Sequence, residues 1–360
     1  MSRNAGLFNL FQGDSRRLAF ALPAALFLLS CRPGGAAELF SSTPVSGPRA
    51  RVVTVHDPAA TDAFRTRPEI IRAMVHRAIT NLTAKATAPE AWRSFVSTQD
   101  TVGIKVFSTP GPNSGTRPAV VAAVIEGLLG AGLPPKQIIV WDKQTIDLRL
   151  AGYFELADRY GIRVMASAQA GYDEKVFYET ALLGNLVWGD YEFGKAGAGV
   201  GRKSFVSKLV SREITKMINV TPLLNHNLAG VSGNLYSLAV GSVDNVVRFE
   251  AEGERLAKAV PEIYALPALS DHVVLNITDA LICQYEGGER GLLHYSATLN
   301  QLRFSRDPVA LDVLSLAELE RQRRAAHAPE LKPNLTLYEI AALLELGVND
   351  PKRIDLEPVR

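Results

Sequence analysis

Residues 101–143 read TVGIKVFSTPGPNSGTRPAVVAAVIEGLLGAGLPPKQIIVWDK, and this stretch decides the fold class. Two short apolar segments, TVGIKVFS and QIIVWDK, flank an Ala/Val-rich segment. Thr116 and Pro118 are typical of a helix start, and Gly130 and Gly132 are typical of a helix end. The stretch therefore predicts a strand, a helix and a second strand, which is the repeating unit of a parallel sheet.

The same alternation continues along the chain. Further candidate strands are β-branched runs, namely RVVTVHD, IRVMAS, KMINVTPL and HVVLNITDALI. Candidate helices are amphipathic segments, namely RPEIIRAMVHRAITNL, TIDLRLAGYFELADRYG, DPVALDVLSLAELERQRRAAH and TLYEIAALLELG. We therefore predict an α/β fold with a mostly parallel or mixed sheet flanked by helices. The ligand cleft of such a fold lies at the carboxyl ends of the strands.

The first residues of the chain have the pattern of an export signal. Arg16 and Arg17 precede LAFALPAALFLLS, an apolar run of 13 residues that is too short to span a bilayer comfortably. The string SRRLAF resembles a twin-arginine signal, so the twin-arginine export machinery is an expected partner. An ordinary secretion signal with two coincidental arginines is the alternative. Either interpretation predicts an exported protein.

The cleavage site has two candidates. The small residues Gly35 and Ala37 predict cleavage after Ala37, which gives a signal peptide over 1–37, a linker over 38–50 and a single α/β domain over 51–360. Alternatively, LLSC ending at Cys31 resembles a lipoprotein box, which would leave a periplasmic protein with a lipid anchor at Cys31.

Charge and cysteine content exclude several functions. Of 39 basic and 37 acidic residues, four arginines and one aspartate precede Glu38, so 35 basic and 36 acidic residues remain. This balance indicates neither a nucleic-acid partner nor a membrane surface, and no membrane span is expected in the mature chain. Cys31 and Cys283 are the only cysteines, which is too few for an iron–sulfur cluster or a cysteine zinc site.

The stretch GAGVGRKS, residues 197–204, is close to a phosphate-binding loop. That motif requires glycine at the position that Arg202 occupies, because the backbone folds tightly there. The preceding LVWGDYEFG is typical of a hairpin arm rather than a buried parallel strand. A flexible turn is therefore the preferred interpretation.

The loop STPGPNSGTRP, residues 108–118, follows a strand and precedes a helix. Ser114, Thr116 and nearby amides in such a loop can hold a phosphate or carboxylate, because a helix N-terminus favours anions. Alternatively, this is a connection rich in turn residues, and Thr116 only caps the helix. The residues alone do not separate these two interpretations.

The stretch INVTPLLNHNLAGVSGNLYS, residues 218–237, ends an apolar run in small hydrogen-bonding groups. His226 can bind a metal or transfer a proton, since imidazole titrates near neutral pH. The flanking Asn225 and Asn227 supply amides, which suit hydrogen bonding better than transition-metal ligation. Alternatively, His226 satisfies backbone groups in a turn.

Acidic residues follow in the C-terminal part of the chain. Asp279 lies inside an apolar strand, where a carboxylate is costly unless it is paired or used, and Glu286 precedes two glycines. Asp307 is a candidate helix N-cap, and Asp312 faces either the site or solvent. Cys283 is expected to be a small buried apolar residue rather than a nucleophile.

Taken together, these segments resemble the domain-of-unknown-function 362 family, in particular its exported twin-arginine branch. The matching pieces run from Val102 to the C-terminus in the expected order, namely VGIKVF, RPAVVAAVIEGLLGAG, IIVWDK, LAGY, INV with HNLAGVSG, ITDALICQYEGG and DPVALDVL. The resemblance implies an α/β fold with these loops around one cleft, but it implies no reaction.

The resemblance also implies residues that this chain lacks. The departures are Phe107 for an expected Asn, Leu224 and Asn225 for an expected Lys before the Asp-His pair, Tyr236 and Ser237 for an expected Lys-Asn, and Glu289 for an expected Pro. Lysines in such a loop would hold an anion or form a Schiff base. Their absence indicates a different ligand or a lost activity.

Two hypotheses follow. The first is a periplasmic enzyme or redox accessory whose cleft holds a small anionic ligand or a metal-bearing cofactor of unknown identity. His226 would be its acid/base or metal ligand, Asp279 the charge partner of His226, and Lys105 the remaining cation. The second is a non-catalytic ligand-binding protein, or a family member that has lost activity. The candidate ligand-binding residues are Lys105, Thr116, Asp142, Asn225, Asn227, Ser232 and Glu286.

Overall fold

The computed structural model describes residues 47–180, 201–329 and 334–359, which belong to one compact unit, Val45–Arg360. The predicted signal peptide and most of the predicted linker lie outside the described residues, as do LVWGDYEFG and the first four residues of GAGVGRKS. No helix among the described residues is long and apolar enough to cross a membrane.

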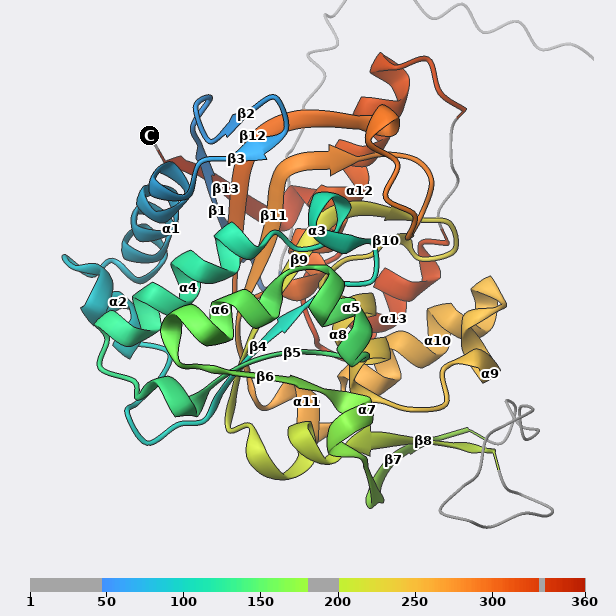
Figure 1. Cartoon of the computed structure of the whole chain (residues 1–360). Helices are drawn as coiled ribbons and strands as arrows, with labels where there is room; N and C mark the ends of the chain where they lie inside the picture. Colours follow the sequence, from blue (N-terminus) through green and yellow to red (C-terminus); the bar gives the residue numbers. More distant parts are fainter. Residues whose placement is uncertain (1–46, 181–200, 330–333, 360) are drawn as a thin grey trace, which may run out of the picture. The chain divides into compact units, whose positions relative to one another are not determined.

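A nine-stranded mixed sheet forms the centre of this unit (Figure 1). Eight strands follow the order β13-β1-β12-β11-β9-β4-β5-β6, and β10 pairs with the end of β9. All neighbours pair in parallel except the pairs made by β12 and β10. The prediction of a mostly parallel or mixed α/β sheet is confirmed. The strands are β1 (Ala50–His56), β4 (Val102–Val106), β5 (Ile138–Asp142), β6 (Arg163–Ala166), β9 (Lys216–His226), β10 (Gly230–Val231), β11 (Val273–Gln284), β12 (Ser296–Ser305) and β13 (Ile354–Val359).

Helices cover both faces of the sheet (Figure 1). One layer contains α1 (Pro68–Thr83), α2 (Ala88–Arg93), α4 (Pro118–Gly130) and α6 (Tyr153–Tyr160). The other layer contains α8 (Asn234–Ser242), α10 (Gly253–Tyr264), α12 (Pro308–Ala325) and α13 (Thr336–Leu343). Successive residues of each strand face opposite layers. For example, Ile104 of β4 packs in the core on one face of the sheet, and Trp141 of β5 packs in the core on the other. Both faces are therefore buried, as the apolar strands predict.

Short elements complete the described chain. Two hairpins lie outside the main sheet, β2 (Thr61–Asp62) with β3 (Arg65–Thr66) and β7 (Tyr172–Glu179) with β8 (Lys203–Ser207). The short helices are α3 (Gly111–Ser114), α5 (Thr145–Leu150), α7 (Ser167–Ala170), α9 (Val247–Glu250) and α11 (Pro267–Ser270). Single turns are η1 (Pro135–Gln137), η3 (Leu209–Glu213), η4 (Leu293–Tyr295) and η5 (Pro351–Arg353).

The structure differs from the predicted elements in several places, and α8 and α10 are helices that were not predicted. The single helix expected over 145–161 is two helices, α5 and α6, because Gly152 between them adopts φ +86°. The strand expected to end near residue 223 continues to His226 and then reverses into β10. Strands β12 and β13 were not predicted, since only the second half of β12 is buried and β13 is buried at Ile354 alone.

Candidate functional site

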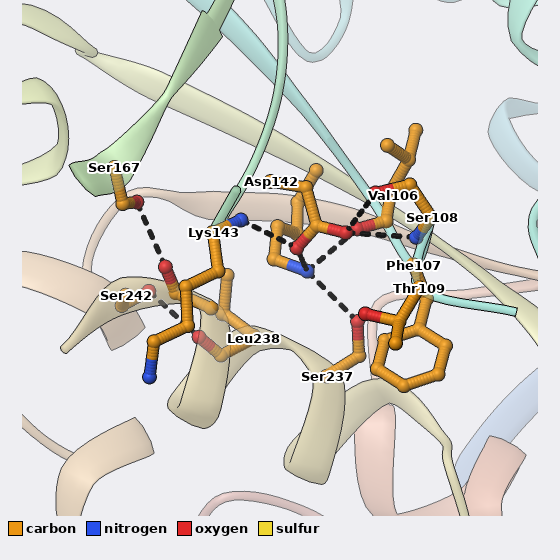
Figure 2. A network of polar contacts seen from close by, with 12 residues as sticks. Val106, Phe107, Ser108, Thr109, Asp142, Lys143, Ser167, Ser237, Leu238 and Ser242 are labelled. Atoms are coloured by element: carbon orange, nitrogen blue, oxygen red, sulfur yellow. Dashed lines mark hydrogen bonds and ion pairs between the residues drawn. The ribbon is translucent and has the colours of Figure 1, made fainter. Parts of the chain in front are cut away.

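A buried ion pair lies at the carboxyl ends of β4 and β5. Lys105 Nζ is 2.9 Å from Asp142 Oδ1, and it also donates to Val106 O at 2.6 Å and to Ser237 Oγ at 3.0 Å. Asp142 Oδ2 accepts hydrogen bonds from both the backbone N–H and the hydroxyl of Ser108 (Figure 2). We call these five residues the Lys105 cluster.

Lys105 has no donor left for a ligand. Lys105 is fully buried, and its three ammonium protons match its three acceptors. Burial lowers the pKa of Lys105, and the adjacent Asp142 carboxylate opposes this shift. Lys105 and Asp142, predicted as ligand-binding residues, therefore hold β4, β5 and α8 together instead.

Thr116 is also structural, although it does not cap the helix. Its hydroxyl donates to Val220 O at 2.7 Å and accepts from Phe107 N at 3.0 Å, so it ties the loop after β4 to β9. Arg117 is the N-cap residue of α4, with no side-chain cap. The interpretation of Thr116 as a helix cap is therefore wrong. Thr116 is fully buried, and its interpretation as an anion ligand stays a prediction.

Asp279 pairs with a cation that the sequence did not indicate. Its Oδ1 lies 3.0 Å from Arg117 Nη1, and its Oδ2 accepts from the backbone N–H of Arg117 at 3.0 Å. A further backbone bond comes from Leu281. The prediction that Asp279 is the charge partner of His226 is therefore wrong, because its acceptor atoms are occupied at the base of α4.

His226 is held by its own hairpin. Its Nδ1 accepts from the backbone N–H groups of Leu228 at 3.2 Å and Ala229 at 2.9 Å. A nitrogen that accepts two hydrogen bonds carries no proton, so the neutral ring has its hydrogen on Nε2. Burial lowers the pKa of His226 to about 4. The ring is thus a neutral donor at physiological pH, and its centroid lies 4.2 Å from that of the Tyr236 ring, with the two planes tilted by 43°.

The neighbours of His226 divide into buried and exposed groups. Asn225 is fully buried; its amide donates to Asn227 Oδ1 and its oxygen accepts from Gly288 N at 2.9 Å. Asn227 is exposed and lines the pocket described next. Ser232 is fully buried, and its hydroxyl has no hydrogen-bond partner among the described residues. Asn225 and Ser232 are therefore closed off from ligands.

An open pocket of about 590 Å³ lies at this edge of the sheet, and we call it the acidic pocket. Its lining residues are His226, Asn227, Leu228, Tyr236, Glu250, Gly287, Gly288, Glu289 and Arg290. The Tyr236 hydroxyl donates to Glu250 Oε1 in a short hydrogen bond and lies 3.3 Å from Glu289 Oε1. Burial and the neighbouring Glu250 carboxylate raise the pKa of Glu289.

The remaining acidic residues have structural roles. Glu286 lies 3.6 Å from Arg323, a buried residue of α12. Asp307 caps α12, because its carboxylate accepts from Ala310 N at 2.8 Å, so that prediction is confirmed. Asp312 faces neither solvent nor a ligand; it is buried and accepts from the first backbone N–H groups of α8. Among the described residues, no three His, Cys, Asp or Glu side chains are grouped so that they can hold a metal ion.

Two other predictions can be compared with the structure. Cys283 is buried, as expected for an apolar role, and burial raises the pKa of its thiol to about 12. The second concerns GAGVGRKS. In the described end of this stretch, Lys203 Nζ lies 4.0 Å from the centroid of the Phe177 ring.

Of the predicted site residues, the structure brings His226 and Asn227 together at the acidic pocket. Sequence reasoning did not place Glu250 and Glu289 at this pocket. One signal was present: Glu289 follows two glycines directly after a long apolar strand, which is where a ligand loop is expected. Glu250 gave no such signal, since it lies in the short helix α9 and not in a loop that follows a strand.

Comparison with known proteins identifies the family of this chain. Residues 102–317 match the family described as Domain of unknown function (DUF362). The chain belongs to this family. A search of the curated proteins found no match. A crystal structure of a Thermotoga maritima protein from a structural genomics consortium is similar with a TM-score of 0.40 and 9% identity. That likeness covers 74% of this chain and 61% of the other, so this chain spans less than two thirds of that protein.

The positions at which this DUF362 member departs from the expected pattern lie close together. Phe107 and Tyr236 form an edge-to-face ring pair with centroids 6.2 Å apart. Ser237 accepts from Lys105, and Tyr236 contacts Glu289 through its hydroxyl. These four departures therefore form one continuous group that connects the Lys105 cluster to the acidic pocket.

Proposed function

We propose that this DUF362 member is a ligand-binding protein whose acidic pocket takes a small molecule with N–H or O–H donor groups. The proposal rests on one observation: the carboxylates of Glu250 and Glu289 both lie next to the hydroxyl group of Tyr236. The Tyr236 hydroxyl has one proton, and the shorter contact shows that it goes to Glu250. Glu289 accepts no other hydrogen bond from the described residues, so it is the acceptor that a ligand donor would satisfy.

This proposal reverses the expected charge of the ligand. The expectation of a small anion rested on Lys105 as the remaining cation, and Lys105 is buried with all its donors used. An anion in the acidic pocket would face Glu250 and Glu289, with the exposed Arg290 as the cation in its lining. Like charges at this distance repel, so a neutral or cationic ligand fits better.

Acid–base catalysis at the same pocket is the second candidate function. The raised pKa of Glu289 makes it suitable as a proton donor beside the carboxylate of Glu250. Incubation of a bound ligand with the protein, followed by NMR spectroscopy of the ligand, separates the two candidates. A chemically changed ligand would favour the enzyme, and an unchanged ligand the binding protein.

We also propose that the protein is exported to the periplasm. The support is the twin-arginine string at Arg16 and Arg17 followed by a short apolar run. A double substitution of both arginines by lysine, with cell fractionation as the measurement, is expected to keep the protein in the cytoplasm. Unchanged export of this variant would exclude the twin-arginine route, and ordinary secretion would then be the better explanation.

The binding proposal is tested by titration calorimetry with six probes. These are glucose, maltose, lactose, myo-inositol, ethanolamine and putrescine, which differ in their O–H and N–H groups. At least one is expected to bind, and Glu289→Gln is expected to weaken its binding at least tenfold. Glu339→Gln, at an exposed residue of α13, is the matched control and should bind as the wild type does. If no probe binds, or if the two variants behave alike, the proposal is wrong.

A further inference from the structure

A second, smaller pocket lies on the other side of His226. It has a volume of about 200 Å³ and is lined by His226, Asn227, Gly230, Leu316, Ala317, Glu320 and Arg323. Four of these residues come from one face of α12, so we call it the α12 pocket. Because His226 and Asn227 line both pockets, they form a wall that the acidic pocket and the α12 pocket share.

Arg323 in the α12 pocket has unused hydrogen-bond donors. Its side chain is only 4% exposed, yet Nε and Nη2 have no hydrogen-bond partner among the described residues. Nε lies 3.6 Å from Glu286 Oε2 and Nη1 lies 4.0 Å from Glu320 Oε2, which is too long for hydrogen bonds in both cases. A guanidinium carries five N–H donors, and burying them unpaired is costly.

The charge around Arg323 decides which kind of acceptor fits. Glu286 and Glu320 lie close enough to compensate its positive charge, although they do not form hydrogen bonds with it. A ligand anion would add a third negative charge to this group and would be repelled. A neutral oxygen, such as that of a hydroxyl, can accept from the guanidinium without this repulsion.

The two pockets thus need opposite hydrogen-bonding partners. The acidic pocket offers the acceptor Glu289 and needs a donor, whereas the α12 pocket offers the donor Arg323 and needs an acceptor. The shared wall adds a donor at His226, whose neutral ring carries its hydrogen on Nε2 because Nδ1 is occupied. A hydroxyl is the group that can donate and accept at once.

We propose that the α12 pocket is a second subsite and that the ligand is a neutral polyhydroxylated molecule of the carbohydrate class, which contacts both pockets across His226. This inference rests on the proposed binding function and adds the ligand class and Arg323 as a specificity-determining residue. The rings of His226 and Tyr236, tilted by 43° to each other, both line the acidic pocket and supply apolar surface beside its polar groups.

The test uses the same six probes with three variants of α12. Arg323→Met removes the donors, and Ala317→Phe fills the α12 pocket from an exposed position of the helix, where the fold tolerates a larger side chain. Arg324→Met is the matched control, because Arg324 is the next residue, is 63% exposed and does not line the pocket. Circular dichroism and thermal unfolding verify that each variant folds.

We expect at least one of the four hydroxylated probes to bind. Its dissociation constant should rise at least tenfold in Arg323→Met and in Ala317→Phe, and less than twofold in Arg324→Met. Binding of ethanolamine or putrescine alone, lost in Glu289→Gln, would overturn the carbohydrate inference and leave the binding function intact. A sugar whose binding depends on Glu289 but not on Arg323 or Ala317 would overturn the second subsite alone. No binding of any probe would overturn both proposals.

Discussion

The Lys105 cluster and the acidic pocket lie at the same edge of one sheet, and both contain a carboxylate beside a hydroxyl group. In the Lys105 cluster the ammonium is fully buried, and each of its three protons has an acceptor. In the acidic pocket two carboxylates share one phenolic proton, and the group opens to solvent. The first group is complete without a ligand, whereas the second has an acceptor left over.

This difference shows what separates a structural cluster from a candidate site. Residue types are similar in both groups, so type alone does not decide. The balance of donors and acceptors, together with access from solvent, decides. Four substitutions test whether the two groups differ in this way.

The largest effect is expected for Lys105→Met. Removal of the ammonium leaves Asp142 buried without its ion-pair partner, and such losses typically cost about 3–5 kcal/mol of the free energy of unfolding. Urea unfolding measures the change. The double variant Lys105→Met with Asp142→Asn should recover part of the loss. A single-variant loss below about 1 kcal/mol would show that the cluster is not the closed structural unit described.

His226→Gln should change how stability depends on pH. The folded protein lowers the pKa of His226 from 6.5 to about 4, so its contribution is present above pH 6.5 and is lost as the pH falls through 4. Over this pH range the free energy of unfolding of the wild type is expected to fall by about 3 kcal/mol more than that of the variant. Unfolding at pH 7 and pH 4 measures it. His327→Gln, at an exposed residue, is the control and should follow the wild type.

Gly241→Ala tests how tightly the Lys105 cluster is packed. A Cβ at Gly241 in α8 would lie 2.2 Å from Lys105 Cε and 2.8 Å from its Nζ, so the lysine must move. Overpacking of this kind costs about 1–3 kcal/mol of the free energy of unfolding. Gly130→Ala in α4 is the matched control, since its Cβ would meet no atom within 4 Å. Equal stability of the two variants would contradict the packing described.

The smallest stability change is expected for Glu289→Gln. Because folding raises the pKa of Glu289, ionisation of this group disfavours the folded state, and the wild type loses stability as the pH rises above the ordinary glutamate range. The amide of the variant does not ionise. At pH 8 its free energy of unfolding should therefore equal that of the wild type or be higher by less than about 1 kcal/mol. Thermal unfolding at pH 5 and pH 8 measures the difference. A clear destabilisation at pH 8 would mean that Glu289 completes a closed network, as Asp142 does.

The sequence predicted the sheet well because its strands are apolar on both faces. β4, β5, β9 and β11 are near-continuous apolar runs bounded by turn residues, and each was found close to its expected place. β12 was missed because its first half is only partly buried and carries polar residues. The position of β12 depends on its pairing with β11 and with β1, which is distant in sequence. Local β-propensity does not predict such pairing.

The candidate site was harder to predict, because burial and partner choice are set by the tertiary fold. Lys105 was taken as a free cation, since the sequence does not show that Asp142 and Ser237 converge on it. Asp279 was paired with His226 because a carboxylate inside an apolar strand needs a partner, but in the structure that partner is Arg117. Only the hairpin around His226 could be predicted locally, as its small residues indicate a turn.

The place of β1 in the sheet has a consequence for the order of folding. This strand contains the first described secondary structure of the chain, yet both of its neighbours, β12 and β13, come from the last part. A ribosome adds on the order of 5–20 residues per second, so β1 waits roughly ten seconds or more for its partners to be made. During that time its apolar residues have no sheet to join. The complete sheet therefore forms only after synthesis is nearly finished, and chaperones acting on the nascent chain would have β1 as an early exposed target.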